Sequence, residues 1–161
     1  MVKICSKCKK PAVTFIRYNG THLCKDHFIQ YFEKRVKKDI KKQGKTYNKS
    51  KIAVAVSGGK DSLVALKIIH KIFLKRKDIK ICSITVDEGI KGYRDKSLVF
   101  AKNYAEKLGV DHYVVSFKQM LNNTMDEISK IKDELGECSY CGVFRRFCLN
   151  KQAKKLEVDK L

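Results

Sequence analysis

The sequence lacks any run of about 18 consecutive apolar residues, which is the length that a membrane-spanning helix needs. It also lacks an apolar N-terminal segment followed by a cleavage site, which is the pattern of a secreted protein. With 161 residues, the chain is too short for two full domains, but it can form one modest core and a smaller module stabilised by a metal. These absences predict a cytoplasmic protein with no membrane partner.

Acidic residues are also scarce: 17 Asp and Glu stand against 36 Lys and Arg, which gives a formal net charge of +19. Solubility needs far less charge than this, so the excess indicates a polyanionic partner, most simply a nucleic acid. A composition rich in lysine and isoleucine is also typical of hot-adapted proteins, and this alternative stays open. The predicted connector over residues 33–50 is especially basic, which fits either a solvated linker helix or a surface that follows phosphates.

Seven cysteines without a secretion signal indicate metal or redox chemistry rather than disulfides. Two pairs of residues near the N-terminus, each with two intervening residues, have the spacing of a zinc site: Cys5, Cys8, Cys24 and His27. His22 is a rival ligand, but His27 repeats the two-residue gap. The segment between the pairs predicts a hairpin that turns at Asn19-Gly20, and a helix is expected over residues 28–36. We therefore predict a zinc module over residues 1–32, with chance cysteines or a redox pair as alternatives.

From residue 51 onward, predicted strands and helices alternate, which is typical of an α/β fold with a parallel sheet and right-handed crossovers. The strands are expected at Ile52–Val56, Ile79–Asp87 and His112–Phe117. The helices are expected near Asp61–Lys75, at Asp95–Leu108, around Leu121–Leu135 and in a last segment that finishes near Leu156. Val158–Leu161 has the pattern of the approach to a fourth strand, from which we expect a missing remainder of the chain.

The turn after the first of these strands has the sequence SGGKDS and predicts a phosphate-binding loop. Its residues are Ser57, Gly58, Gly59, Lys60, Asp61 and Ser62. The first N–H groups of the following helix have no intrahelical partner, the glycines let the backbone come close, and the lysine adds a cation, so an anion fits this turn. The spacing differs from that of the common Gly-Lys-Ser/Thr nucleotide loop. An ordinary glycine turn, in which Asp61 only complements the helix N-terminus, is the alternative.

A second cysteine pair, Cys138 and Cys141, is followed closely by Arg145 and a further arginine. Three chemistries fit the pair: two ligands of an iron–sulfur cluster, a redox dithiol, or half of a second zinc site. Cys148 lies two helical turns, roughly 10.5 Å, beyond Cys141, which is long for ligands of one compact cluster. We therefore expect Cys148 to have a packing role, and Cys82 to be a small buried hydrophobe within a strand.

Four motifs follow one another along the chain: CxxC with CxxH, SGGKDS, DEGIKGYRDKS and CSYCGVFRR. Together they resemble the tRNA 2-thiouridine synthetases of the archaeal and eukaryotic cytosolic type, within the PP-loop ATP-pyrophosphatase superfamily. The resemblance covers all 161 residues. It implies a zinc module followed by a PP-loop parallel sheet of the adenine nucleotide alpha hydrolase type over residues 51–161. It also implies a carboxy-terminal half, with a third cluster cysteine and a second zinc module, that this sequence does not contain.

The resemblance further implies an enzyme that uses ATP to adenylate the C2 carbonyl of a tRNA uridine, releases pyrophosphate, and replaces AMP by sulfur. By this resemblance the SGGKDS residues hold the β- and γ-phosphates together with Mg²⁺, and Lys60 and Asp61 act in catalysis. Ala55 and Val86 match positions that border the nucleoside, and Arg145 matches a basic position that meets the nucleotide.

Cys138 and Cys141 match two of the three ligands of a [4Fe–4S] cluster and are candidate catalytic residues. The implied partners are tRNA, a ubiquitin-like sulfur-carrier protein and a second copy of the chain in a homodimer. Two other functions stay open: an inactive truncated fragment that acts at most as a zinc-containing RNA-binding module, and a PP-loop ligase with a substrate other than tRNA. The alternative for Asp87 and Glu88, which belong to the third motif, is that they are polar residues at a strand end without a functional role.

Overall fold

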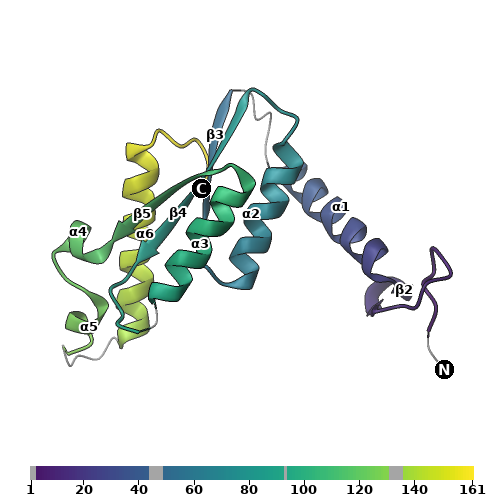
Figure 1. Ribbon diagram of the computed structural model, residues 1–161, viewed down its shortest axis with the longest axis horizontal. Helices are drawn as coiled ribbons and strands as arrows, with labels where there is room; N and C mark the ends of the chain where they lie inside the picture. Colours follow the sequence, from purple (N-terminus) through teal and green to yellow (C-terminus); the bar gives the residue numbers. More distant parts are fainter. Residues whose placement is uncertain (1–2, 44–48, 93, 131–135) are drawn as a thin grey trace. The chain divides into compact units, whose positions relative to one another are not determined.

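The computed structural model describes residues 3–43, 49–92, 94–130 and 136–161 (Figure 1). The chain divides into two compact units, Met1–Thr46 and Tyr47–Leu161. Each unit has a hydrophobic core of its own.

The first unit contains a short hairpin and a long helix. β1 (Thr14–Ile16) and β2 (Thr21–Leu23) pair antiparallel, with the short 3-10 helix η1 (Arg17–Asn19) between them. Gly20 has a left-handed φ of 65°, and the Thr21 N–H donates to the Asn19 side chain at 3.2 Å. This is the turn that the Asn-Gly pair predicted, because both residue types stabilise such a backbone.

α1 (Lys25–Gln43) begins directly after Cys24 and continues well past residue 36, where the predicted helix ended. The basic connector is therefore helical as far as Gln43. Lysine and arginine favour this extension because their unbranched side chains lose little freedom in a helix.

The second unit is built on a parallel sheet in the order β3 (Ser50–Ala55), β4 (Ile79–Asp87) and β5 (Asp111–Ser116). β3 connects to β4 through α2 (Lys60–Phe73), and β4 connects to β5 through α3 (Arg94–Leu108). The predicted alternation and parallel pairing are confirmed. The predicted end of the third strand at Phe117 is wrong, because β5 ends at Ser116. The Ser116 hydroxyl accepts a hydrogen bond from the Gln119 N–H at 3.1 Å, and a helix begins at Phe117.

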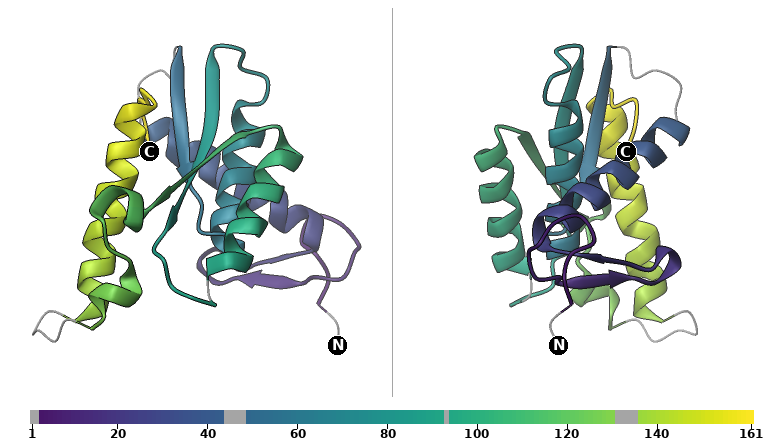
Figure 2. Two further views of the ribbon diagram at one scale, coloured as in Figure 1. Left: turned by 60° about the vertical axis from the view of Figure 1, so that its left-hand side comes forward. Right: turned by 90° about the vertical axis from the view of Figure 1, so that its right-hand side faces the viewer.

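Helices cover both faces of this sheet, as the two views of Figure 2 show. α2 and α3 pack on one face, where the core residues include Val56, Leu66, Ala101, Ala105 and Val110. α6 (Glu137–Lys155) packs on the other face over Cys82, Ile84, Val86 and Val115, and contributes Cys148 and Ala153. The apolar strands are thus buried between two helical layers, which is the usual environment of a parallel sheet.

The prediction of one helix around Leu121–Leu135 is wrong for the residues of that range that the structure describes. α4 (Phe117–Leu121) ends at Asn122, which has a left-handed φ of 59° and donates its N–H to the Lys118 carbonyl. α5 (Met125–Ile128) then begins with a capping box between Thr124 and Glu127. These local hydrogen bonds end one helix and start another. Residues 131–135 of the expected helix lie outside the described part of the chain.

The last residues of the sequence begin to pair with the outer edge of β3, as the predicted fourth strand would. Lys160 forms a parallel bridge with Ile52, and its carbonyl accepts the Ala53 N–H at 2.8 Å. The Asp159 N–H donates to the Lys51 carbonyl at 2.9 Å. β3 therefore has neighbours on both sides near Ile52.

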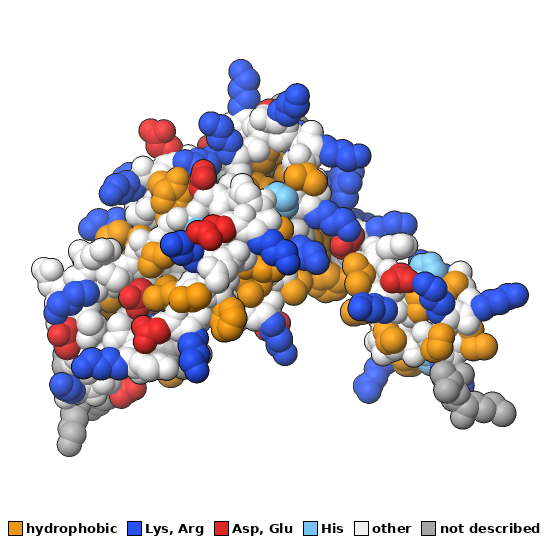
Figure 3. Space-filling model, viewed as in Figure 1, with side chains coloured by type: hydrophobic (Ala, Val, Ile, Leu, Met, Phe, Trp, Pro, Cys, Tyr) orange, Lys and Arg blue, Asp and Glu red, His pale blue; other side chains and the backbone are white. Residues whose placement is uncertain are grey.

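Within the described residues, no helix has both the length and the apolar character needed to cross a membrane. Figure 3 shows Lys and Arg side chains over the visible face of each unit, with hydrophobic and acidic side chains between them. On this face the positive charge is spread widely rather than confined to one element.

Candidate functional site

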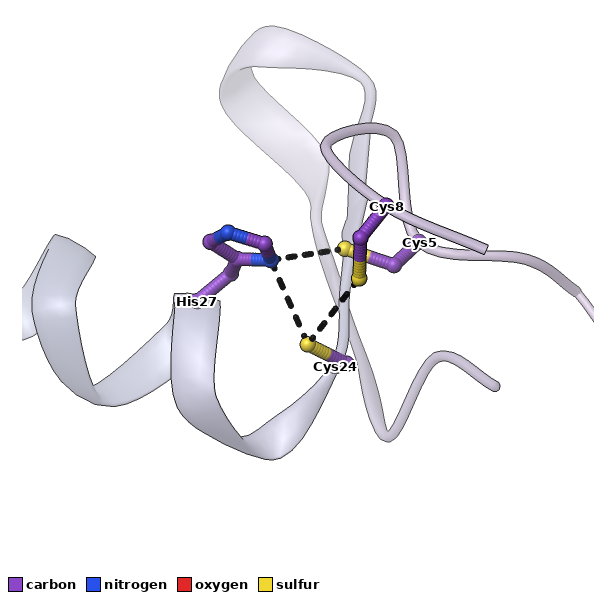
Figure 4. Close-up of side chains that lie close together, drawn as sticks. All are labelled: Cys5, Cys8, Cys24 and His27. Atoms are coloured by element: carbon purple, nitrogen blue, oxygen red, sulfur yellow. Dashed lines mark hydrogen bonds between the residues drawn. The ribbon is translucent and has the colours of Figure 1, made fainter. Parts of the chain in front are cut away.

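The four predicted metal ligands of the first unit lie together. Cys5 and Cys8 come from the loop before β1, Cys24 directly precedes α1, and His27 lies in the first turn of that helix (Figure 4). The His27 Nδ1 atom is 3.4 Å from the Cys5 Sγ and 3.3 Å from the Cys24 Sγ, while the Cys8 and Cys24 sulfurs are 3.7 Å apart. All four donor atoms lie within 4.8 Å of one another.

These separations fit a tetrahedral zinc site. Zn–S and Zn–N bonds of about 2.3 and 2.0 Å place two sulfurs about 3.8 Å apart, and a sulfur and a nitrogen about 3.5 Å apart. Burial opposes ionisation of Cys5, but hydrogen bonds from the Cys24 and Lys7 backbones and from His27 outweigh it and lower its pKa to about 6. The thiolate that results is the form that binds a metal. His22 is not part of the cluster, because its ring stacks on Phe15 with centroids 4.5 Å apart.

In the second unit, the SGGKDS loop joins the carboxyl end of β3 to the N-terminus of α2. The side chain of Ser62 closes the loop: its hydroxyl accepts the Ser57 N–H at 3.1 Å and donates to the Gly59 carbonyl at 2.8 Å. Gly58 has φ of +84°, and an added Cβ atom would lie 2.1 Å from the Ser97 carbonyl oxygen at the start of α3. Lys60 and Asp61 are exposed in the first turn of α2. This arrangement leaves helix N–H groups and a cation available to an anion.

Ala55 and Val86 lie near the carboxyl ends of adjacent strands, β3 and β4. Ala55 is exposed, and because side chains alternate along a strand it shares a face with Ala53, which packs toward α6. Val86 is buried on that same face, with 4% of its surface exposed. Ala55 is thus open to a ligand at this edge, whereas the Val86 side chain belongs to the core.

Sequence reasoning missed the role of Glu88, which immediately follows β4. Its side chain is 1% exposed, and its carboxylate forms ion pairs with two arginines. Arg94 binds both carboxylate oxygens, with Nη2 at 2.6 Å from Oε1 and Nε in contact with Oε2. Arg145 donates from Nε to Oε1 at 2.8 Å. The only signal in the sequence was an acid at a predicted strand end, which usually indicates nothing more than solvent exposure.

Arg145 also connects this carboxylate to the second cysteine pair, because its Nη2 donates to the Cys141 Sγ at 3.2 Å. Burial acts to lower the pKa of Arg145, but the charge and hydrogen bond of Glu88, together with the contact to Cys141, outweigh it and the pKa is raised. Burial raises the pKa of Cys141, although Arg145 opposes this shift. Cys138 is exposed in the first turn of α6.

Cys148 and Cys82 are fully buried in the core of the sheet, which confirms their predicted packing roles. Of the five remaining cysteines, Cys5, Cys8 and Cys24 belong to the cluster of the first unit. The described residues therefore offer two thiols near Arg145, and these do not complete the three-cysteine ligand set that the family resemblance implies for a [4Fe–4S] cluster.

Comparison with known proteins gives two family matches. Residues 4–29 match the N-terminal LIM domain of the 2-thiouridine synthetase TtuA, and residues 30–157 match the PP-loop domain. The tRNA 2-thiolation protein NcsA of Haloferax volcanii is 37% identical over 164 residues, which cover 98% of this chain and 51% of that protein. The cytoplasmic tRNA 2-thiolation protein 1 of Danio rerio is 38% identical over 160 residues, or 98% of this chain and 46% of that protein.

Solved structures agree with these matches. The U34-tRNA thiolase NcsA from Methanococcus maripaludis, solved with its [4Fe–4S] cluster, superposes with a TM-score of 0.84 at 33% identity, over 99% of this chain and 52% of that one. The NH3-dependent NAD synthetase from Campylobacter jejuni shares the fold alone, with a TM-score of 0.53 at 11% identity over 78% of this chain and 50% of that one. The chain spans about half the length of the curated relatives it matches.

The metal-ligand cluster, the SGGKDS loop and the parallel sheet thus agree with both sets of comparisons, and the chain belongs to the PP-loop family, with the TtuA-type LIM module at its N-terminus and tRNA 2-thiolation proteins among its homologues.

Proposed function

We propose that this chain binds ATP and activates a tRNA uridine for 2-thiolation. One observation carries the proposal: Glu88 and its two arginines join the phosphate loop to the CxxC helix at the carboxyl ends of the strands. Parallel sheets of this kind bind their ligands at that edge. A site that activates an oxygen with ATP and then delivers sulfur needs both groups close to one substrate atom.

In the proposed reaction the C2 carbonyl oxygen of the uridine attacks the α-phosphorus of ATP, and the bond to the β-phosphate breaks. The pyrophosphate that leaves carries the developing negative charge. The N–H groups at the start of α2 stabilise this charge because the helix holds them in position before the reaction begins, and Lys60 adds a positive charge beside them. Asp61 supplies a carboxylate for the Mg²⁺ that accompanies ATP.

In the second step a sulfur nucleophile attacks C2, and AMP leaves with the former carbonyl oxygen. Cys138 and Cys141 are the two thiols of α6 that are not buried in the core, and the Cys141 Sγ accepts a hydrogen bond from Arg145, which meets the nucleotide in the proposed complex. A [4Fe–4S] cluster, a group that the solved relative contains, would present the incoming sulfur in the proposed reaction, but the two thiols of this chain would need a further ligand to hold it. No step depends on the cluster here.

Zn²⁺ is the metal that we propose for Cys5, Cys8, Cys24 and His27, with a structural role, since all four tetrahedral positions are filled by the protein. The proposal further places the chain in the cytoplasm, with a ubiquitin-like sulfur-carrier protein as sulfur donor and a homodimer as the assembly. Relatives named as cytoplasmic tRNA 2-thiolation proteins support the location.

The RNA-binding module is a second candidate, and a specific observation favours it. The Arg35 guanidinium lies over the Tyr18 ring, 5.2 Å from its centroid, and donates to the Tyr18 hydroxyl at 2.7 Å. Tyr18 is 67% exposed. An exposed aromatic ring beside a cation, next to a basic helix, can contact bases and phosphates without any ATP chemistry.

The test measures pyrophosphate release from ATP with and without tRNA. The proposal expects release only when tRNA is present, and loss of that release in Lys60→Met. Lys67→Met is the matched control, because Lys67 is an exposed lysine of the same helix about two turns away. Salt-dependent tRNA binding without pyrophosphate release would favour the RNA-binding module, and release driven by a small molecule instead of tRNA would favour a ligase.

A further inference from the structure

We infer that Arg94 is a positioning residue for the phosphate loop, held in place by Glu88, and that it fixes the loop geometry without touching the phosphate. An arginine side chain has five N–H donors in a planar fork. In Arg94, each of these five donors has an acceptor. The acceptors are both carboxylate oxygens of Glu88, the Val86 and Ser57 carbonyl oxygens, and the Ser97 hydroxyl. The guanidinium is therefore fully hydrogen-bonded although the residue is only 7% exposed.

These contacts join the backbone elements that must be aligned for a phosphate to bind. Nη2 holds the Val86 carbonyl near the end of β4 at 2.8 Å. Nη1 holds the carbonyl of Ser57, the first residue of the loop, at 3.1 Å. Because Arg94 is itself the first residue of α3, the same side chain connects this helix to the strand end and to the loop.

A second contact supports the loop from the same helix. The Ser97 carbonyl occupies the place that a side chain on Gly58 would need, so the loop backbone packs directly against the first turn of α3. The Ser97 hydroxyl also donates to the Arg94 carbonyl at 2.9 Å. The loop thus rests on one helical turn through both a side chain and the backbone.

Glu88 makes this arrangement stable, because a buried guanidinium needs a counter-charge. It binds Arg94 with both oxygens and still accepts a hydrogen bond from Arg145, which is 48% exposed and reaches Cys141. Two cations on one carboxylate leave a net positive charge between the loop and the CxxC pair, which favours an anion there. The loop is also connected to Arg145: Ser57 accepts a hydrogen bond from Arg94, and the ion pairs of Glu88 with Arg94 and with Arg145 complete the connection.

The experiment compares pyrophosphate and ATP binding to the whole chain by calorimetry. In Arg94→Lys the charge opposite Glu88 remains, but a single ammonium cannot reach all five acceptors. We expect pyrophosphate and ATP to bind about tenfold more weakly, because a loop displaced by a fraction of an ångström no longer presents its N–H groups correctly. Val115→Ala is the control, since it opens a cavity in the buried core on β5 and lowers the melting temperature without contacting the loop.

The inference is wrong if Arg94→Lys binds pyrophosphate as tightly as the wild type, or if Val115→Ala with the same loss of melting temperature binds it equally weakly. The inference rests on the proposed function only in requiring that the loop binds the phosphates of ATP. A wild-type chain that binds neither pyrophosphate nor ATP would contradict that proposal, whereas normal wild-type binding with an unaffected Arg94→Lys variant would contradict the inference alone.

A measurement on the wild type covers the case in which Arg94→Lys does not fold. Nuclear magnetic resonance of the arginine side-chain N–H groups should show the Arg94 signals protected from exchange with water, and shifted when pyrophosphate binds to the loop that Arg94 holds. Signals that exchange freely, or that do not shift at saturating pyrophosphate, would overturn the inference.

Discussion

Gly58 occupies a position where no side chain fits. Its φ of +84° is left-handed, and a Cβ atom would lie 2.1 Å from the Ser97 carbonyl oxygen, which belongs to helix backbone and cannot move aside. The glycine of the phosphate loop is therefore required by packing between the loop and α3, in addition to the space it leaves for a phosphate.

We predict that Gly58→Ala removes pyrophosphate binding and lowers the free energy of unfolding by at least about 2 kcal/mol, since a steric clash adds to the backbone strain. Gly109→Ala is the control, because Gly109 has φ of +66° and nothing within 4 Å of its Cβ position. That variant should cost about 1 kcal/mol and leave binding unchanged. Calorimetry and urea unfolding measure both quantities, and equal effects of the two substitutions would contradict the steric explanation.

His112 gives the second unit a dependence on pH. Its Nδ1 atom is 2.9 Å from the Ser83 hydroxyl, while Nε2 is buried without a partner among the described residues. Burial lowers the pKa of His112 below its ordinary value of 6.5, although Glu106 acts in the opposite direction. The unfolded chain consequently binds a proton more readily than the folded chain does.

We predict that the free energy of unfolding is constant with respect to this group above pH 6.5 and falls as the pH drops from 6.5 through the lower pKa of the folded state. His112→Gln should remove this component, so its unfolding curve should depend less on pH over that interval. Urea unfolding at a series of pH values checks the slope. A wild-type stability that rises on acidification from pH 6.5, or a variant with the same slope as the wild type, would contradict the assignment.

At the scale of elements, α5 depends on Thr124, the capping residue directly before it. The Thr124 hydroxyl accepts the Glu127 N–H at 3.2 Å, and the Glu127 carboxylate accepts the Thr124 N–H at 2.7 Å. The helix has four residues, so these two bonds are a large part of what holds it. Lys118 adds an ion pair to Glu127 at 3.1 Å.

Thr124→Ala should therefore lower the free energy of unfolding by about 1 kcal/mol. Thr124→Ser keeps the hydroxyl and should recover most of the loss. Thermal unfolding compares the two variants, and hydrogen exchange of the Glu127 amide shows whether the loss is local to α5. If alanine and serine have the same effect, the packing of the Thr124 methyl group against Gly89 is responsible instead of the cap.

The elements also show which features were predictable from sequence. Strands β3 and β4 and helices α2 and α3 were predicted because runs of apolar residues with the right period lie between glycine turns. The break after Leu121 was missed, although the sequence T-x-x-E at residues 124–127 is a capping-box pattern that could have indicated it.

In the candidate sites, local patterns were predictable and long-range contacts were not. The predicted metal ligands Cys5, Cys8, Cys24 and His27 do lie together, as two short spacings of this kind indicate. The contact between Glu88 and Arg145 joins residues 57 positions apart and depends on how α6 packs against the sheet. No pattern in a single sequence encodes that packing, so Glu88 could not be distinguished from an ordinary polar residue.

At the scale of the whole molecule, the two units differ in what stabilises them. The buried core of the first unit consists of Cys5, Leu23 and Cys24, so two of its three members are also predicted metal ligands. The second unit has two apolar clusters, one on each face of its sheet. We therefore expect the first unit, with so small an apolar core, to need the proposed metal in order to fold, whereas the core of the second unit does not depend on one.

Removing zinc with a chelator should therefore unfold the first unit and leave the second intact. Nuclear magnetic resonance should show loss of dispersed signals for β1, β2 and the start of α1, with unchanged signals for β3 to β5, and Cys24→Ala should give the same result without chelator. Cys82→Ala is the control for removing a buried cysteine, because Cys82 lies in the sheet of the second unit. Retained signals for the first unit without metal, or loss of signals throughout the chain, would contradict this division.

The buried pair of Glu88 and Arg94 has a consequence for how this family changes over time. A substitution at either position alone leaves a buried charge without its partner, which costs several kcal/mol and would be removed by selection in most lineages. The two positions should therefore be inherited together, and lineages that lose the acid should lose the arginine as well. A distant relative that has lost both Glu88 and Arg94 could then be recognised from its sequence as one whose phosphate loop is held by other residues.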